Sequence, residues 1–369
     1  MSTLWWELPG PRRFIERVAH DLRDGKNVVI GIPKYGPSDL FSAIQRVLRE
    51  EGNWYWQRID ATNHEGTPPA HMLIERFVLD PPSGELWNAN LLAQQNAFAG
   101  QVIWVDDMTA EAWPGWREFI TDYAHACRSR PPYARGLCVV PLCGALACES
   151  ITPDICLSLH LWRGCVDWLD MLLYAANIMP HNSLTRIQRD TALAAIAHLA
   201  LWDQQVADLL ANETLDTIFN PENVLRQMAI ERGWNKLPPK SHAWHLGIID
   251  VVDAQGEKKH SAVLALNNTD RELEGRIWSA QVGIMFPLIE EHRRRLLKQL
   301  EKRLRIPFVT RFGAVINDVW DLEIGHIAAQ VKEHRIPLSM LDRQLLGQLV
   351  HIRNCLSHLD VLEPDLLNL

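Results

Sequence analysis

Residues 28–38 read Val-Val-Ile-Gly-Ile-Pro-Lys-Tyr-Gly-Pro-Ser and lead from an apolar run into a loop rich in glycine and proline. The run from Val28 to Ile32 is mostly β-branched, which is typical of a strand buried on both faces. Residues 38–50, which follow the loop, carry apolar side chains at helical spacing. The stretch therefore predicts a strand, a loop and a helix, the repeating unit of a parallel sheet.

Further apolar runs extend this pattern. Residues 101–105 and 136–141 predict two more strands, and residues 113–127 predict a helix between them. After about residue 160 the strand signal fades, and residues 162–180 and 184–212 are rich in Leu and Ala at helical spacing. We predict an α/β domain with a parallel sheet over residues 1–160 and a helical, lid-like region over 161–237.

The remainder, residues 238–369, predicts a third region. It begins at the paired prolines 238 and 239, a plausible linker. Two β-like runs favour a hairpin, and three helical segments favour a small antiparallel bundle. These runs are 248–252 and 262–266, and the helical segments are 271–305, 314–333 and 338–360.

The loop after the first strand keeps the frame of a P-loop, GxxxxGK[ST], whose backbone N–H groups hold phosphates. Gly31, Gly36 and Ser38 occupy the glycine and hydroxyl positions. Pro37 stands where the lysine belongs, so a cation and a backbone donor are lost together. Lys34 lies inside the loop as a substitute cation, although its side chain starts earlier than that of a P-loop lysine.

A second element lies at the end of the next predicted buried strand. Residues 102–107 form an apolar strand that ends in Asp106 and Asp107, the form of a Walker B element that binds magnesium and polarises water. Together the two elements resemble the nucleotide-binding domain of AAA-type and STAND-type ATPases. The resemblance implies a site for ATP and Mg²⁺, with a phosphate-sensing arginine before the third predicted strand, where Arg128, Arg130 and Arg135 lie.

Three interpretations of this region stay open. Loss of the lysine favours a weak or inactive nucleotide site, because charge-assisted phosphate contacts are the strong ones. A working ATPase switch would use Ser38, Asp106 and Asp107 despite Pro37. An α/β domain with a glycine turn and no nucleotide would show the same letters.

The C-terminal stretch 351–358 reads His-Ile-Arg-Asn-Cys-Leu-Ser-His and contains Arg353, Asn354 and His358 in an Rx4H pattern. It resembles the HEPN family of helical domains. The resemblance implies a metal-independent ribonuclease, with histidine as acid or base, arginine stabilising phosphate charge, and a site composed across a dimer. On an ideal helix Arg353 and His358 diverge by about 140°. The alternative is a non-catalytic bundle used for self-association, in which the arginine pairs with a buried acid such as Glu323.

The predicted helix 271–305 is the most basic stretch, with nine basic and five acidic residues. It would lie beside the Rx4H segment, which suits an RNA phosphate backbone. A solvated helix face with ion pairs between neighbouring turns is the alternative.

Composition and charge exclude several classes of protein. The 369 residues carry a formal net charge of -8, so the whole molecule is no general polyanion binder. No apolar stretch approaches the roughly 18 residues of a membrane span. The N-terminus lacks the pattern of a signal peptide, so we expect a cytoplasmic protein. The seven cysteines form no CxxC pair, and we expect reduced thiols and no structural metal.

A STAND-like module joined to a HEPN-like module resembles proteins of prokaryotic antiphage and conflict systems. We therefore predict a sensor or scaffold component of a defence-type complex, with a weakened nucleotide site and other protein subunits as partners. The gated ribonuclease and the active ATPase switch are the alternatives.

Overall fold

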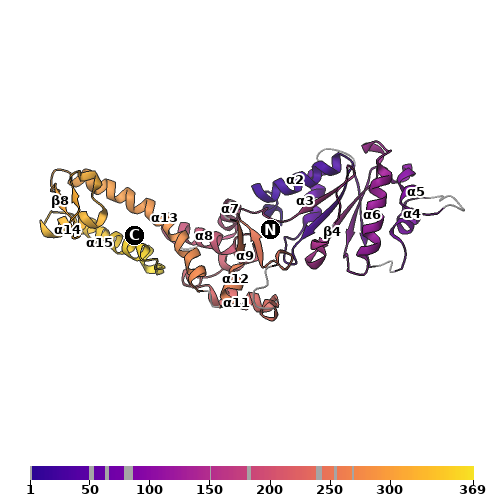
Figure 1. Cartoon of the computed structure of the whole chain (residues 1–369). Coiled ribbons are helices and arrows are strands. Elements are labelled where there is room, and N and C mark those ends of the chain that lie inside the picture. Colours follow the sequence, from indigo (N-terminus) through magenta and orange to yellow (C-terminus); the bar gives the residue numbers. More distant parts are fainter. Residues whose placement is uncertain are drawn as a thin grey trace. The chain divides into compact units, whose positions relative to one another are not determined.

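The computed structural model describes residues 2–49, 54–62, 66–78, 86–149, 151–180, 184–237, 243–252, 256–267 and 270–369 (Figure 1). The chain divides into two compact units. The first comprises Met1–Asp170 and Pro238–His260, and the second comprises Met171–Leu237 and Ser261–Leu369. This division differs from the predicted boundaries after residues 160 and 237. The predicted linker at Pro238 and Pro239 lies outside the described residues.

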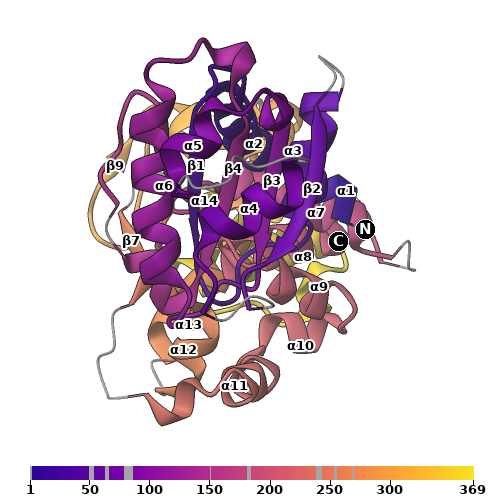
Figure 2. The same cartoon turned by 90° about the vertical axis from the view of Figure 1, so that its right-hand side faces the viewer.

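The described part of the first unit contains a five-stranded sheet in which all paired strands are parallel. The prediction of an N-terminal α/β domain with a parallel sheet is therefore confirmed. The strands follow one another across the sheet in the order β2-β3-β4-β1-β5, and the first four can be followed in Figure 2. Their bounds are β1 (Asn27–Ile32), β2 (Tyr55–Asp60), β3 (Gln101–Asp106), β4 (Leu137–Cys143) and β5 (Leu157–Leu161).

Helices cover both faces of this sheet (Figure 1). One face carries α2 (Pro9–Arg23) and α3 (Leu40–Arg49), and the other carries α4 (Pro69–Phe77), α5 (Ala89–Gln94) and α6 (Trp113–Cys127). Because successive side chains of a strand point to opposite faces, β1 contributes alternate residues to each layer. Val29 joins Ile103, Val140 and the buried side of α6 in one core.

The helix α2 begins at a close approach between backbone and carboxylate. The amide of Gly10 donates to Oδ1 of the buried Asp170 at 2.9 Å. Oδ2 of the same carboxylate accepts the amide of Asp167 at 2.9 Å. A Cβ at Gly10 would lie 2.1 Å from the carbonyl oxygen of Cys165 and 2.3 Å from Asp170 Oδ2. Only glycine fits there without movement.

The segment 243–260 returns to the first unit through hydrogen bonds. Trp244 Nε1 donates to the carbonyl of Trp162 at 3.1 Å, and the amide of Gly164 donates to Asp250 Oδ1 at 2.9 Å. An antiparallel pair, β6 (Ile249–Val251) and β7 (Glu257–Lys259), confirms a hairpin here. The second predicted strand, 262–266, is wrong, because these residues form α12 (Ser261–Leu266). An apolar run alone does not separate a buried strand from a buried helix.

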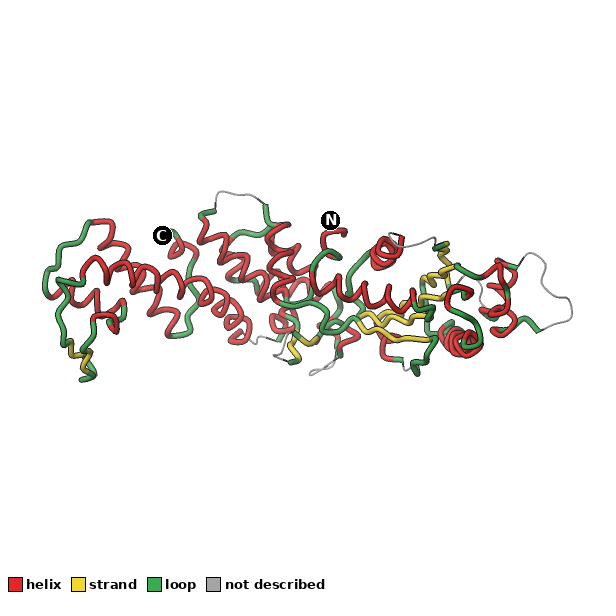
Figure 3. The backbone as a smooth tube through the Cα atoms, turned by 90° about the horizontal axis from the view of Figure 1, so that it is seen from above, coloured by secondary structure: helices red, strands yellow, loops and turns green. Residues whose placement is uncertain are grey.

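The second unit is mostly helical, whereas the strands, yellow in Figure 3, gather chiefly in the first unit. The helix α7 (Trp168–Ile178) crosses the boundary between the units. The longest helix, α13 (Asp270–Leu300), packs against α8, α14 and α15, so the predicted lid-like and C-terminal regions share one core. The remaining helices are α8 (Arg186–Ala200), α9 (Gln204–Ala211), α10 (Leu215–Phe219), α11 (Glu222–Glu231), α14 (Ile324–Glu333) and α15 (Met340–Ser357).

Two of the three predicted C-terminal helices are confirmed, and one is partly wrong. The segment 314–333 is helical only from Ile324, after a short hairpin of β8 (Phe308–Val309) and β9 (Val315–Ile316). Short helical turns complete the described chain. They are α1 (Ser2–Trp5), η1 (Asn96–Phe98), η2 (Pro132–Ala134), η3 (Gly144–Cys148), η4 (Trp234–Lys236), η5 (Trp244–Leu246), η7 (Val319–Asp321) and η8 (Pro364–Leu367).

Polar side chains close the core of the second unit. Trp278 Nε1 donates to the carbonyl of Leu356 at 2.7 Å, which ties α13 to the end of α15. The buried Gln281 donates to the carbonyl of Leu362 at 3.0 Å and accepts its amide at 2.7 Å. These contacts hold the C-terminal segment onto α13. Among the helices that the structure describes, none combines the length and apolar character needed to cross a membrane.

We expect Gly10→Ala to destabilise the first unit by about 1–3 kcal/mol, because the added methyl group overlaps buried backbone and carboxylate oxygens. A matched control is Gly115→Ala, which lies in the first turn of α6 and whose Cβ would meet no described atom within 4 Å. This control should gain up to about 1 kcal/mol from the better helix former. Thermal unfolding of both variants checks the difference, and equal effects would contradict the packing at Gly10.

We predict that the free energy of unfolding depends on pH because of the buried carboxyl of Asp250. Burial raises the pKa of its carboxyl to about 6 from its ordinary value of 3.8. The folded protein therefore holds the proton between these pH values, and stability falls as the pH rises toward 6 and stays lower above it. Asp250→Asn keeps the oxygen that accepts the amides of Gly164 and Val251. We expect it to stabilise the protein by on the order of 1–3 kcal/mol at pH 8 and little at pH 4. Denaturant unfolding at both pH values checks this, and a gain that is equal at both would refute it.

Candidate functional site

The glycine loop lies at the carboxyl edge of the sheet, between β1 and α3, where open parallel sheets bind ligands. Its backbone donors are largely used within the protein. The amide of Lys34 donates to the carbonyl of His245 at 2.8 Å, and the amide of Gly36 donates to the carbonyl of Pro33 at 2.9 Å. Pro33 and Pro37 have no N–H group. Four of the six residues 33–38 thus offer no amide to a phosphate as the loop stands.

The conformation of the loop accounts for its glycine. A Cβ at Gly36 would lie 2.3 Å from Cγ2 of Ile32, so the tight turn after β1 requires glycine whether or not a ligand binds. The carbonyl of the exposed Ser38 accepts Nε1 of Trp6 at 3.0 Å. Asp39, with φ of 60°, precedes α3. The carboxylate of Asp39 therefore lies at the N-terminus of α3, the position at which helices of other proteins bind a phosphate.

Gly31 and Lys34 are placed by their neighbours. A Cβ at Gly31 would lie 2.6 Å from Cδ2 of Leu161 on the adjacent strand β5, so this glycine serves the packing of the sheet. Lys34 is exposed, and its Nζ lies 5.4 Å from the ring centroid of Tyr35. The structure therefore brings Gly31, Lys34, Gly36 and Ser38 to one edge of the sheet.

The acids of the Walker B-like strand lie at the same edge, with β4 between β3 and β1. Both carboxylate oxygens of Asp106 are engaged. Nε of Arg58 donates to Oδ2 at 2.6 Å, its second terminal nitrogen donates to Oδ1 at 2.8 Å, and Trp104 Nε1 donates to Oδ1 at 2.9 Å. The Asp106 carboxylate raises the pKa of Arg58. Asp107 is exposed and has φ of 50°. These donors take three of the about four acceptor sites of the carboxylate, so a metal ion at Asp106 would compete with them and lie beside the Arg58 cation.

The predicted sensor arginines lie elsewhere. Arg128, Arg130 and Arg135 precede β4 and so lie at the amino edge of the sheet, opposite the glycine loop. Arg128 pairs with Asp154, and Arg130 donates to Asn96 Oδ1 at 3.0 Å. Arg135 donates to the carbonyl of Gly25 at 2.9 Å, just before β1. The structure does not bring these arginines together with the loop or the acids.

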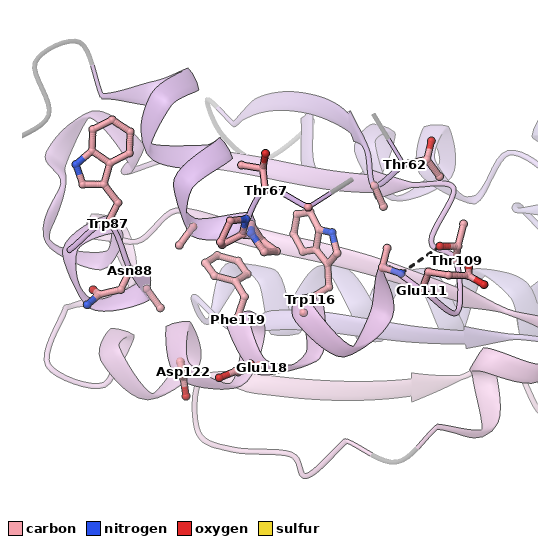
Figure 4. A pocket seen from close by; sticks show the side chains of 18 residues that line it. Thr62, Thr67, Trp87, Asn88, Thr109, Glu111, Trp116, Glu118, Phe119 and Asp122 are labelled. Carbon is pink, nitrogen blue, oxygen red and sulfur yellow. Dashed lines mark hydrogen bonds between the residues drawn. The ribbon is translucent and has the colours of Figure 1, made fainter. Parts of the chain in front are cut away.

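A cavity of about 770 Å³ lies between α4, α5, α6 and the carboxyl ends of β2 and β3 (Figure 4). Trp87, Trp116 and Phe119 line it, and the ionisable side chains at its described wall are Glu111, Glu118 and Asp122. A cavity lined by aromatic side chains and acidic groups suits a neutral or cationic ligand better than a phosphate. No sequence motif predicts this cavity, because its wall residues come from separate segments. Of the neighbouring tryptophans Trp113 and Trp116, Trp116 lines the cavity and Trp113 does not.

The Rx4H residues lie at the end of α15. Arg353 donates to Glu323 Oε2 at 2.6 Å, so the predicted alternative pairing with Glu323 is present. Glu323 is 58% exposed and is the N-cap of α14, not a buried acid. Asn354 is exposed and lies 3.5 Å from a terminal nitrogen of Arg353. The helix ends at Ser357, so the exposed His358 lies just beyond it.

The basic helix α13 holds part of its charge in ion pairs. Arg276, Arg293, Arg294 and Arg295 each pair with an acidic side chain. Arg293 also donates to the carbonyls of Trp320 and Leu322 at 2.8 and 2.9 Å. A group of exposed basic side chains follows at the C-terminal end of the helix, namely Lys298, Lys302, Arg303 and Arg305. These four, together with the exposed Arg271 at the start of the helix, are basic side chains of the predicted RNA-binding segment that a phosphate backbone could reach.

Comparison with known proteins gives no match, either to a family model, to a curated protein or to a solved structure. Within the described ranges, no group of three or more His, Cys, Asp or Glu side chains is arranged to hold a metal ion. The cysteines that the structure describes are all free.

The pair of Arg353 and Glu323 should contribute less than about 1 kcal/mol to stability, because both side chains are solvent-exposed. A double-mutant cycle with Arg353→Ala and Glu323→Ala, read by denaturant unfolding, measures this coupling. A coupling of several kcal/mol would mean that Arg353 is structurally essential. The unfolding curve of Arg353→Ala in the same experiment shows whether this variant is folded and therefore fit for functional tests.

Proposed function

We propose that this protein is a sensor or scaffold subunit whose α/β unit is built like a nucleotide-binding domain but does not perform phosphate chemistry. The observation that carries this proposal is the hydrogen bonding at the carboxyl edge. The amides of Lys34 and Gly36 and both oxygens of Asp106 already have protein partners.

The energetics support a lost nucleotide site. A triphosphate would have to replace the amide contacts of the loop and release Asp106 from Arg58, and a hydrogen bond to a charged group is worth about 1.5–3 kcal/mol. No lysine at position 37 repays this cost, because proline stands there. The carboxylate of Asp39 adds like charge at the start of α3.

The cavity between α4, α5 and α6 supports a sensing role for the same unit. Its aromatic side chains provide apolar contact, and its acidic residues exclude polyanions. A sensor of this kind would respond to a neutral or cationic molecule, not to ATP.

Titration calorimetry with ATP and Mg²⁺ tests the proposal. We expect no binding in the micromolar range for the wild-type protein and none for Pro37→Lys, because restoring the cation leaves the amides of Lys34 and Gly36 occupied. Micromolar binding to wild-type protein that is lost in Asp107→Asn or Ser38→Ala would contradict the proposal. It would establish the nucleotide-controlled switch instead.

The second unit is proposed to mediate self-association within a larger complex of the defence type, the context that the HEPN-like resemblance implies. Support comes from large apolar side chains that are exposed in this unit, including Phe312 at 82%, Met340 at 85% and Leu341 at 79%. Met340 and Leu341 are adjacent at the start of α15, and a contiguous exposed apolar patch marks an interaction surface. Light scattering after size exclusion should show a dimer or larger species at micromolar concentration. A monomer would contradict this part of the proposal.

A second candidate function is a metal-independent ribonuclease. The exposure of Asn354 and His358 at the end of α15 favours it. The amide of His358 still donates to the carbonyl of Asn354 at 3.1 Å, so the divergence from Arg353 remains, and such a site would be composed across two copies of the chain. RNA cleavage by the purified protein should be abolished by His358→Ala and by Arg353→Ala, with His334→Ala as a control on an exposed histidine of the same unit. Cleavage that survives both substitutions would exclude this activity.

A further inference from the structure

A thiol and an imidazole meet at the carboxyl edge of the sheet. Sγ of Cys148 lies 3.4 Å from Nδ1 of His245, within the range of a hydrogen bond to sulfur. Cys148 ends η3, the helical turn that follows β4, and His245 lies in η5, which packs against η3. Cys148 is exposed, and His245 is partly exposed. The pair thus joins two distant segments of the first unit at a place that small molecules can reach.

We propose that Cys148 is a reactive thiol that His245 activates for exchange with low-molecular-weight disulfides. The proposal does not depend on the nucleotide site or on the proposed function. The thiolate is the nucleophile in such exchange, and a base within hydrogen-bond reach generates it. Nδ1 of His245 is positioned to accept the thiol proton.

The step is a balanced exchange. The Cys148 sulfur attacks one sulfur of the incoming disulfide, forming a mixed disulfide while the original S–S bond breaks. The second half of the reagent leaves as a thiolate and takes up the proton that His245 received. Cys148 is oxidised and the leaving half is reduced, so no further oxidant is needed.

The buried cysteines lack this arrangement. Burial raises the pKa of the Cys127 and Cys165 thiols, each to about 11, and raises that of Cys138 further. Burial also raises the pKa of Cys156. These four thiols stay protonated and inaccessible, so they do not compete with Cys148.

Two other cysteines provide internal comparisons. Cys143 is exposed on the same edge, but its sulfur faces the carbonyl of Pro33 at 3.8 Å, and partial burial raises the pKa of its thiol. Cys355, in the second unit, lies 3.8 and 3.9 Å from the two ring nitrogens of His351. These distances are longer and nearly equal, so neither nitrogen is aimed at the sulfur. Cys148 differs from both residues by its shorter contact with a single imidazole nitrogen, Nδ1 of His245.

The test follows modification of the reduced full-length protein by oxidised glutathione, with peptide mass spectrometry reporting each cysteine separately. We expect Cys148 to form the mixed disulfide at least about tenfold faster than Cys143, because only Cys148 has a base in reach. Equal rates at the two residues would overturn the proposal. This comparison is made within the wild-type protein and needs no variant to fold.

The role of the imidazole is tested with His245→Gln, which leaves the His245 backbone carbonyl and its contact with Lys34 in place. We expect the rate at Cys148 to fall by about tenfold or more and the rate at Cys143 to stay the same. Thermal unfolding of the variant serves as the check on folding. An unchanged rate at Cys148 in a folded His245→Gln protein would show that the exchange does not use His245.

Discussion

The hydrogen bond from the Lys34 amide to the His245 carbonyl joins the loop after β1 to a segment that lies far along the chain. It uses an amide of the loop for internal structure, and with it the residues 243–260 become part of the first unit. The loop, the turn η3 and the turn η5 are in this way held at one edge of the sheet. This contact, more than the spacing of the glycines, decides which backbone amides at that edge are open to a ligand.

At the same edge, the residues that match a nucleotide-site pattern have structural roles in the fold. Gly31 and Gly36 are required by the packing of Leu161 and Ile32, respectively, so they would persist without a ligand. Asp106 is likewise held by Arg58 and Trp104, side chains of the neighbouring strand and of its own strand. Among the described residues, small molecules can reach the acidic, aromatic cavity at the carboxyl ends of β2 and β3 and the exposed thiol of Cys148. Both favour ligands other than nucleoside triphosphates.

The sequence predicted the buried parts of the fold well, because burial leaves a clear pattern. The strands β1, β3 and β4 and the helix α6 follow from long apolar runs and helical spacing. The edge strands β2 and β5 were missed. Tyr55–Asp60 carries mixed polar residues and is only partly buried, and Leu157–Leu161 is short and half-buried. An edge strand covers less apolar surface, so its pattern is weak.

The site was predictable only in part. The loop and Asp106 lie at one edge of the sheet because each comes at the carboxyl end of a parallel strand, β1 and β3, and this can be predicted from the sequence. The partners of their polar atoms do not, since Lys34 with His245 and Asp106 with Arg58 are contacts between distant segments, which leave no local pattern. The arginines before β4 failed to join the site for a geometric reason, because a residue that precedes a parallel strand lies at the opposite edge.

Amide hydrogen exchange at Lys34 and Gly36, with and without ATP and Mg²⁺, observes the two hydrogen bonds that hold the loop amides within the protein. We expect both amides to be protected in the free protein and their exchange rates to stay unchanged when the nucleotide is added. A change in either rate on addition of nucleotide would show that the loop exchanges its internal partners for phosphate, and would contradict the loss of the nucleotide site.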